Sequence, residues 1–101
     1  MKVKTSPFDA ADYLKTEEAI AAYLDFVLED GTPQEIARAL GTAARARGMS
    51  EIAEDTGMSR TSLYKSLSEN GNPSVDTLLK VVRSLGLQLH VKPIDEHATT
   101  G

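Results

Sequence analysis

One short segment of the chain concentrates side chains that can bind nucleic acid. Residues 58–68 contain two basic side chains and no acidic one. Arginine can make a bidentate contact to guanine, and the hydroxyls of serine and threonine can serve several bases or a phosphate. This segment is therefore the best candidate for contact with DNA, through Ser59, Arg60, Thr61, Ser62, Tyr64 and Lys65.

The residues around this segment predict two short helices joined by a tight turn, over residues 49–67. Ser50 and Ser59 each precede a helical stretch and can accept a hydrogen bond from a free N–H in its first turn. The small side chain of Ala53 lets the two helices cross closely, and Gly57 permits a positive φ in the turn. In such a helix-turn-helix, the second helix places its N-terminal side chains in the major groove.

The register of the second helix decides which side chains point outward. Leu63 is expected to face the core, which leaves Arg60 and the two residues after it free to face DNA. Lys65 lies one turn further and can reach a base or the backbone. Tyr64 can pack its ring on the protein while its hydroxyl meets a phosphate. The main role expected for Ser59 is to cap the helix, and a phosphate contact is a secondary role. The alternative for each outward residue is an ordinary solvated side chain.

Three longer helices are expected around this motif. Thr32 and Glu35 form a capping box with a proline between them, which marks a helix start. Gly41, inside that helix, suggests that another helix packs closely at this point. Near the helix end, Arg45 and Arg47 suit the negative end of the macrodipole, and we favour that role over one in DNA binding. Periodic apolar residues and flanking stop signals predict these helices over residues 17–30, 33–47 and 75–85.

The pattern changes after the last helix. Leu87, Leu89 and Val91 alternate with polar residues, which is typical of a half-buried strand. Such a strand needs a partner, either residues 2–5 or the same strand in a second copy of the chain. We thus predict an all-α domain of five helices with a short C-terminal β-strand. It has an N-terminal arm (1–15), a helix-turn-helix domain (16–94) and a flexible tail (95–101).

The charge of the chain is divided unevenly. The formal net charge of −4 lies entirely in residues 1–30, while the remaining residues are balanced. Four of the five aromatic residues also lie in the first 26 residues. The acidic total therefore does not exclude DNA as a ligand, and it points to a second, separate functional region.

Several short segments of the sequence resemble those of a known family. They are residues 8–14 (FDAADYL), 44–50 (ARARGMS), 62–67 (SLYKSL), 71–81 and 85–87. Together they resemble the lambda-repressor/Cro class of helix-turn-helix proteins and, more closely, HigA-like addiction module antidotes, over about residues 5–93. Ser66 stands where many such motifs have an aliphatic core residue, and Leu67 is expected to take that role.

The resemblance implies an antitoxin that neutralises a RelE/ParE-like toxin and represses its own operon. We expect the protein to act in the cytoplasm, because no signal peptide or membrane span is visible. Such toxins are typically basic, so an acidic surface would steer association with them. A homodimer is expected, since two half-sites improve affinity and specificity. As an alternative to toxin contact, the acidic residues form an ordinary solvated face. The alternative for Phe8 and Tyr13 is that they anchor the segment to its own core. The implied toxin contacts are Phe8, Asp9, Asp12, Tyr13, Glu17 and Glu18.

Other classes of function find little support. The chain has no cysteine, and neither His90 nor His97 has partners at a spacing that suggests a catalytic triad or a metal site. We expect no enzymatic activity, no cofactor and no bound metal. No signal peptide or membrane span is visible in the sequence. Two alternatives remain: a regulator of the same fold without a toxin, and an interaction module that no longer binds DNA.

Overall fold

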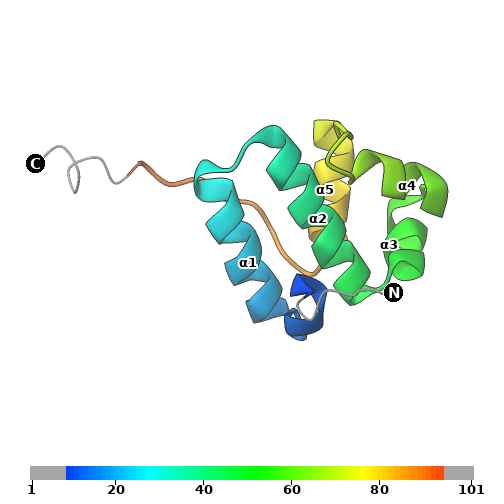
Figure 1. Ribbon diagram of the computed structural model, residues 1–101, viewed down its shortest axis with the longest axis horizontal. Coiled ribbons are helices and arrows are strands. Elements are labelled where there is room, and N and C mark those ends of the chain that lie inside the picture. Colours follow the sequence, from blue (N-terminus) through cyan, green and yellow to red (C-terminus); the bar gives the residue numbers. More distant parts are fainter. Residues whose placement is uncertain (1–8, 95–101) are drawn as a thin grey trace, which may run out of the picture.

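The computed structural model describes residues 9–94 and is helical throughout its regular elements (Figure 1). The predicted all-α class and the number of five α-helices are confirmed for these residues. A single 3-10 turn, η1, precedes them. The elements in chain order are η1 (Ala10–Tyr13), α1 (Glu17–Asp30), α2 (Pro33–Arg47), α3 (Met49–Thr56), α4 (Arg60–Ser66) and α5 (Val75–Ser84).

Most helix starts follow the capping signals in the sequence. The Thr32 hydroxyl accepts from the Glu35 N–H at 3.1 Å, and the Glu35 carboxylate accepts from the Thr32 N–H at 2.9 Å. Ser59 and Ser74 each accept from an N–H three residues later. Ser50 is the exception, because α3 begins at Met49 after a Gly48 cap, with no side-chain cap hydrogen bond.

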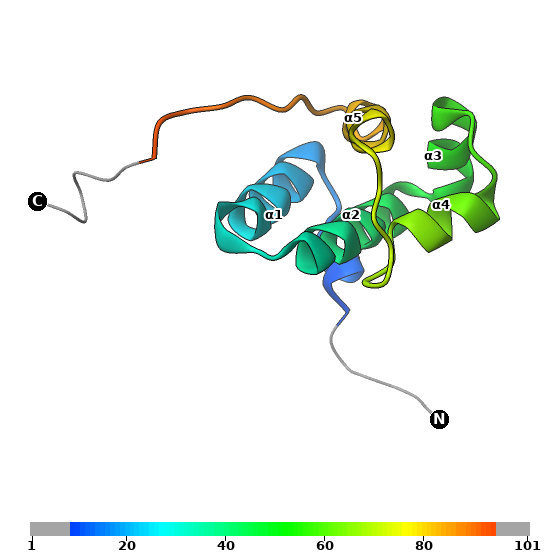
Figure 2. The same cartoon turned by 90° about the horizontal axis from the view of Figure 1, so that it is seen from above.

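Helix α2 lies in the middle of the fold. In both views α1 lies on one side of it, while α3 and α4 lie on the other (Figures 1 and 2). Helix α5 packs mainly on α3. Its buried residues are mostly alanines, whose small side chains allow neighbours to approach closely. The largest fully buried side chains of the core come from the other helices and the end of α5: Ile52, Leu63, Val81 and Leu85.

The predicted C-terminal strand is wrong. Residues 87–94 lie outside any helix or strand, and Figure 2 shows them leaving α5 as an extended segment. Leu87 donates its N–H to the Val82 carbonyl at 3.1 Å, so it closes the end of α5 rather than starting a ladder. Val91 is 96% exposed. An extended segment becomes a strand only when a second one pairs with it, and no other described segment does so. Residues 2–5 and the predicted tail lie outside the described residues.

Candidate nucleic-acid interface

Helices α3 and α4 are joined by a three-residue turn, as the spacing predicted. Gly57 has a φ of +75°, the left-handed conformation that glycine adopts without strain. The Met58 N–H donates to the Ala53 carbonyl at 3.1 Å, which closes the end of α3. Ile52 and Leu63 have no exposed surface. These contacts fix the direction in which α4 leaves the turn.

The outer face of α4 carries the predicted side chains. The backbone N–H of Ser62 donates to the Ser59 hydroxyl at 3.0 Å, so the predicted cap is present. Leu67 is buried, with 3% exposed, while Ser66 is half-buried, which confirms Leu67 as the core residue. All six candidate residues are exposed: Ser59, Arg60, Thr61, Ser62, Tyr64 and Lys65.

Tyr64 does not fill the core. Its side chain is 45% exposed, and the guanidinium carbon of Arg60 lies 5.8 Å from the centre of its ring. A guanidinium at this distance from an aromatic face is weakly attracted to it. The ring therefore limits the directions that Arg60 samples while leaving its donors free for a ligand.

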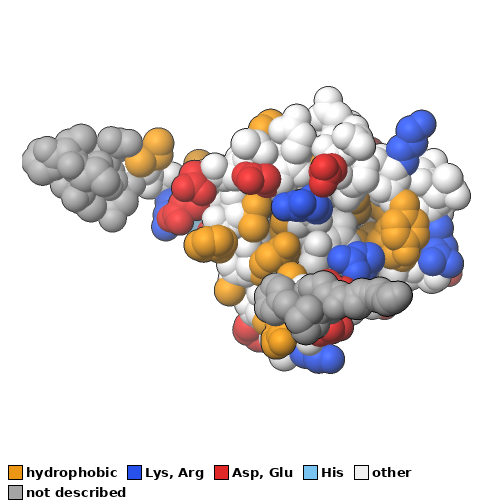
Figure 3. All heavy atoms as spheres, viewed as in Figure 1, with side chains coloured by type: hydrophobic (Ala, Val, Ile, Leu, Met, Phe, Trp, Pro, Cys, Tyr) orange, Lys and Arg blue, Asp and Glu red, His pale blue; other side chains and the backbone are white. Residues whose placement is uncertain are grey.

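Two further basic residues lie next to this face, on α2. Arg38 and Arg45 line a small cavity of about 170 Å³ together with Tyr64 and Ser68. Both are exposed, and Lys and Arg side chains are visible over α2 and α4 in Figure 3. The sequence-based predictions did not include Arg38, and for Arg45 they favoured a role at the helix dipole over one in DNA binding. Their spacing of seven residues, two helical turns, was the available signal that they share a face.

These two arginines have partners within the chain. Arg38 lies 3.5 Å from Glu69, and Arg45 lies 3.4 Å from Asp9. Ion pairs between exposed side chains are weak, because water screens them. A phosphate could therefore replace either carboxylate at little cost.

The N-terminal acidic residues are only partly available to a partner. The Asp9 carboxylate accepts from the Ala11 N–H at 3.1 Å and pairs with Arg45, and these hydrogen bonds lower its pKa below the usual 3.8. Tyr13 is 62% exposed, so it is not a core anchor. The core residue of this segment is Leu14. Asp12 and Glu18 are exposed, and Phe8 lies outside the described residues.

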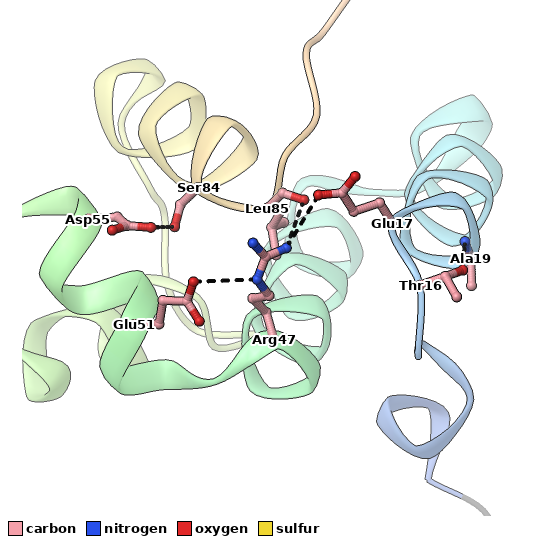
Figure 4. A network of polar contacts seen from close by, with 8 residues as sticks. All are labelled: Thr16, Glu17, Ala19, Arg47, Glu51, Asp55, Ser84 and Leu85. Carbon is pink, nitrogen blue, oxygen red and sulfur yellow. Dashed lines mark hydrogen bonds and ion pairs between the residues drawn. The ribbon is translucent and has the colours of Figure 1, made fainter.

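Arg47 joins three elements to α2. Its guanidinium lies 3.7 Å from the Glu17 carboxylate at the start of α1 and 3.6 Å from that of Glu51 in α3. It also donates to the Leu85 carbonyl at the end of α5, at 3.4 Å (Figure 4). The preference for a structural role over DNA contact agrees with this position. Glu17, a predicted toxin contact, is thus already engaged within the chain.

Residues 9–94 contain neither a membrane-spanning helix nor a cluster of metal-binding side chains. No helix there is long and apolar enough to cross a membrane. The same residues contain no group of three or more His, Asp or Glu side chains placed to hold a metal ion.

The fold and its surface define a small all-helical protein with an exposed basic face on α4. Residues 4–93 match the family model described as "probable addiction module antidote protein", and the chain belongs to that family. An uncharacterised protein of Haemophilus influenzae is 46% identical over 92 residues, which cover 91% of this chain and 95% of that protein. No solved structure matches the chain. Membership of an antidote family implies an antitoxin role and a toxin partner of some kind.

Proposed function

We propose that this chain is the antitoxin of a type II toxin–antitoxin system. It neutralises a RelE/ParE-like toxin by direct binding, and it represses its own operon through sequence-specific DNA binding. It acts in the cytoplasm as a homodimer with a lambda-repressor-like fold, and it is not an enzyme. The observation that carries the proposal is an exposed, acid-free face on α4 in a chain of the antidote family.

The arrangement of α4 supports DNA binding. Its capped N-terminal turn carries Arg60 and Thr61, both exposed, at the end of the helix that contacts base edges in a major groove. Lys65 lies one turn further along, and a phosphate suits its compact charge. Phosphate contacts set the position of the helix, and base contacts provide specificity. In this proposal Arg60 reads a base, and Lys65 holds the backbone.

The charge distribution supports a basic protein as the second ligand. The acidic excess lies in residues 1–30, whereas the candidate DNA-binding residues lie in residues 59–65. Complementary charge accelerates the encounter of two proteins. Binding would neutralise the toxin by covering a surface that must itself contact RNA.

A dimer follows from the size of the DNA-binding face. Helix α4 has seven residues, so one copy covers only a few base pairs. Two copies related by a twofold axis would bind half-sites about one DNA turn apart. The operator is therefore expected to be a palindrome.

Co-expression with the neighbouring gene tests this function. The short reading frame beside this gene is cloned, and its product is expressed in a growth assay with and without this chain. We expect a basic protein that arrests growth alone, is harmless with this chain and co-purifies with it. We also expect the purified chain to shift a fragment of its own promoter and not a scrambled fragment. A promoter shift without any toxin would instead identify a stand-alone regulator, and toxin binding without a shift would identify an interaction module.

A further inference from the structure

The outer face of α1 carries charge that the fold itself does not use. The helix contains five acidic residues and no basic one. Glu17 pairs with Arg47, but the other four make no ion pair or side-chain hydrogen bond with any described residue. These four exposed acids are Glu18, Asp25, Glu29 and Asp30.

Two of these acids stand where they destabilise the helix. Glu29 and Asp30 are the last residues of α1, next to its free carbonyls and the negative end of the macrodipole. Asp25 and Glu29 also stand four residues apart, so like charges face each other along the helix. Lysine at either end position would favour the fold. Positions that break a local stability rule without compensation within the fold are typical of binding surfaces.

Apolar surface borders the acids on both sides. Phe26 is 75% exposed and lies four residues before Asp30, on the same side of the helix. On the other side, Ala21 and Leu28 line a groove of about 490 Å³, which the α2, α5 and C-terminal segments close. An exposed aromatic residue within a charged rim is the usual composition of an energetically dominant interface contact.

The charge of this face determines which partner it fits. DNA and anionic lipid would be repelled by four unpaired carboxylates. A second copy, placed by a twofold axis, would bring the same acids against each other. A basic protein gains from both the carboxylates and the Phe26 ring. Figure 3 shows acidic side chains at the end of α1 that leads into α2, and Figures 1 and 2 place α1 and α4 at opposite ends of the molecule.

We propose that the toxin docks on the outer face of α1, through Phe26 and the carboxylates of Asp25, Glu29 and Asp30. This inference rests on the proposed antitoxin function and places its main toxin contact on the C-terminal half of α1, away from Asp9 and Glu17. The face is separate from α4, so toxin and operator can be bound at the same time.

Charge reversal and ring removal test this surface. The two variants are Glu29→Lys and Phe26→Ser. Their matched controls are Glu54→Lys, an exposed acid of α3 without an ion pair among the described residues, and Val75→Ser, an apolar residue of α5 that is 72% exposed. The purified product of the adjacent reading frame is titrated into each full-length protein by calorimetry. We expect each α1 variant to bind it at least tenfold more weakly, and each control to bind like the wild type.

Four outcomes separate the possible explanations. Glu29→Lys should unfold at a temperature equal to or higher than the wild type, which excludes misfolding as the cause of lost binding. Toxin binding by both α1 variants at wild-type affinity would overturn this surface and leave the antitoxin function standing. Failure of the wild-type chain to bind the toxin would overturn both. A change from dimer to monomer in either α1 variant, measured by light scattering, would assign the face to a second copy and overturn the proposal.

Discussion

Gly41 of α2 lies directly against the backbone carbonyl of Leu67, the residue that caps the C-terminal end of α4. A Cβ at position 41 would collide with that carbonyl oxygen. The glycine is therefore a packing requirement, as its place inside a helix suggested. It sets how closely the proposed DNA-reading helix approaches the centre of the fold.

Gly41→Ala should destabilise the protein despite the better helix propensity of alanine. The propensity gain is up to about 1 kcal/mol, but the collision is with backbone, which cannot rotate away. Overpacking of this kind costs about 1–3 kcal/mol. We expect a net loss of about 1–2 kcal/mol in chemical denaturation. Gly48→Ala is not a suitable control, because Gly48 has a φ of +121°. Ala22→Gly, at an exposed position inside α1, measures the effect of helix propensity. An unchanged or raised stability of Gly41→Ala would show that α4 can move away freely.

Arg60→Ala should weaken binding to the operator by about 1–3 kcal/mol if its guanidinium reads a base. The loss should be largest for the natural operator and small for unrelated DNA, so the specificity ratio falls. Quantitative gel shifts with the natural operator and with unrelated DNA measure this ratio. Phe26→Ser, at the far end of the molecule, is the control. If Arg60→Ala and Thr61→Ala combined bind the operator like the wild type, the proposed reading face is wrong.

Lys65→Gln should instead weaken binding to all sequences alike. A phosphate contact releases about one counterion, so the slope of affinity against salt concentration should fall by about one. Titrations at several salt concentrations separate this from base reading. A changed sequence preference with an unchanged salt slope would place Lys65 on a base.

Asp9 makes a small contribution to stability that depends on pH. Hydrogen bonds from the Ala11 N–H and from Arg45 lower the pKa of its carboxyl in the folded chain. The stabilisation is therefore fully present above pH 3.8 and disappears as the pH falls through the lower, folded-state pKa. Asp9→Asn should be less stable than the wild type near neutral pH, and the difference should shrink in acid. Thermal unfolding of both proteins from pH 6 to pH 2.5 measures it. A difference that stays constant over this range would contradict the pKa shift.

The sequence predicted what depends on local signals. The capping residues Thr32 and Ser59 marked helix starts correctly, because a cap depends on hydrogen bonds within four residues of the chain. The alternation at Leu89 and Val91 led to a wrong prediction of a strand. Such alternation produces a strand only if a second segment forms backbone hydrogen bonds with it. The proximity of Arg38 to Tyr64 depends on how α2 crosses α4, and no local sequence pattern predicts that crossing. The pairing of Asp9 and Glu17 with arginines was hidden for the same reason.

The position of Arg47 has a consequence for how the molecule opens. Helix α1 packs mainly on α2, and the Glu17–Arg47 ion pair links its start to the rest of the fold. Such a peripheral element can detach in a local opening that leaves the remaining helices folded. The backbone amides of α1 should therefore exchange with deuterium faster than those of α2, and Arg47→Met should speed exchange in α1 more than in α4. The helix proposed to hold the toxin is then also the part of the fold that separates first.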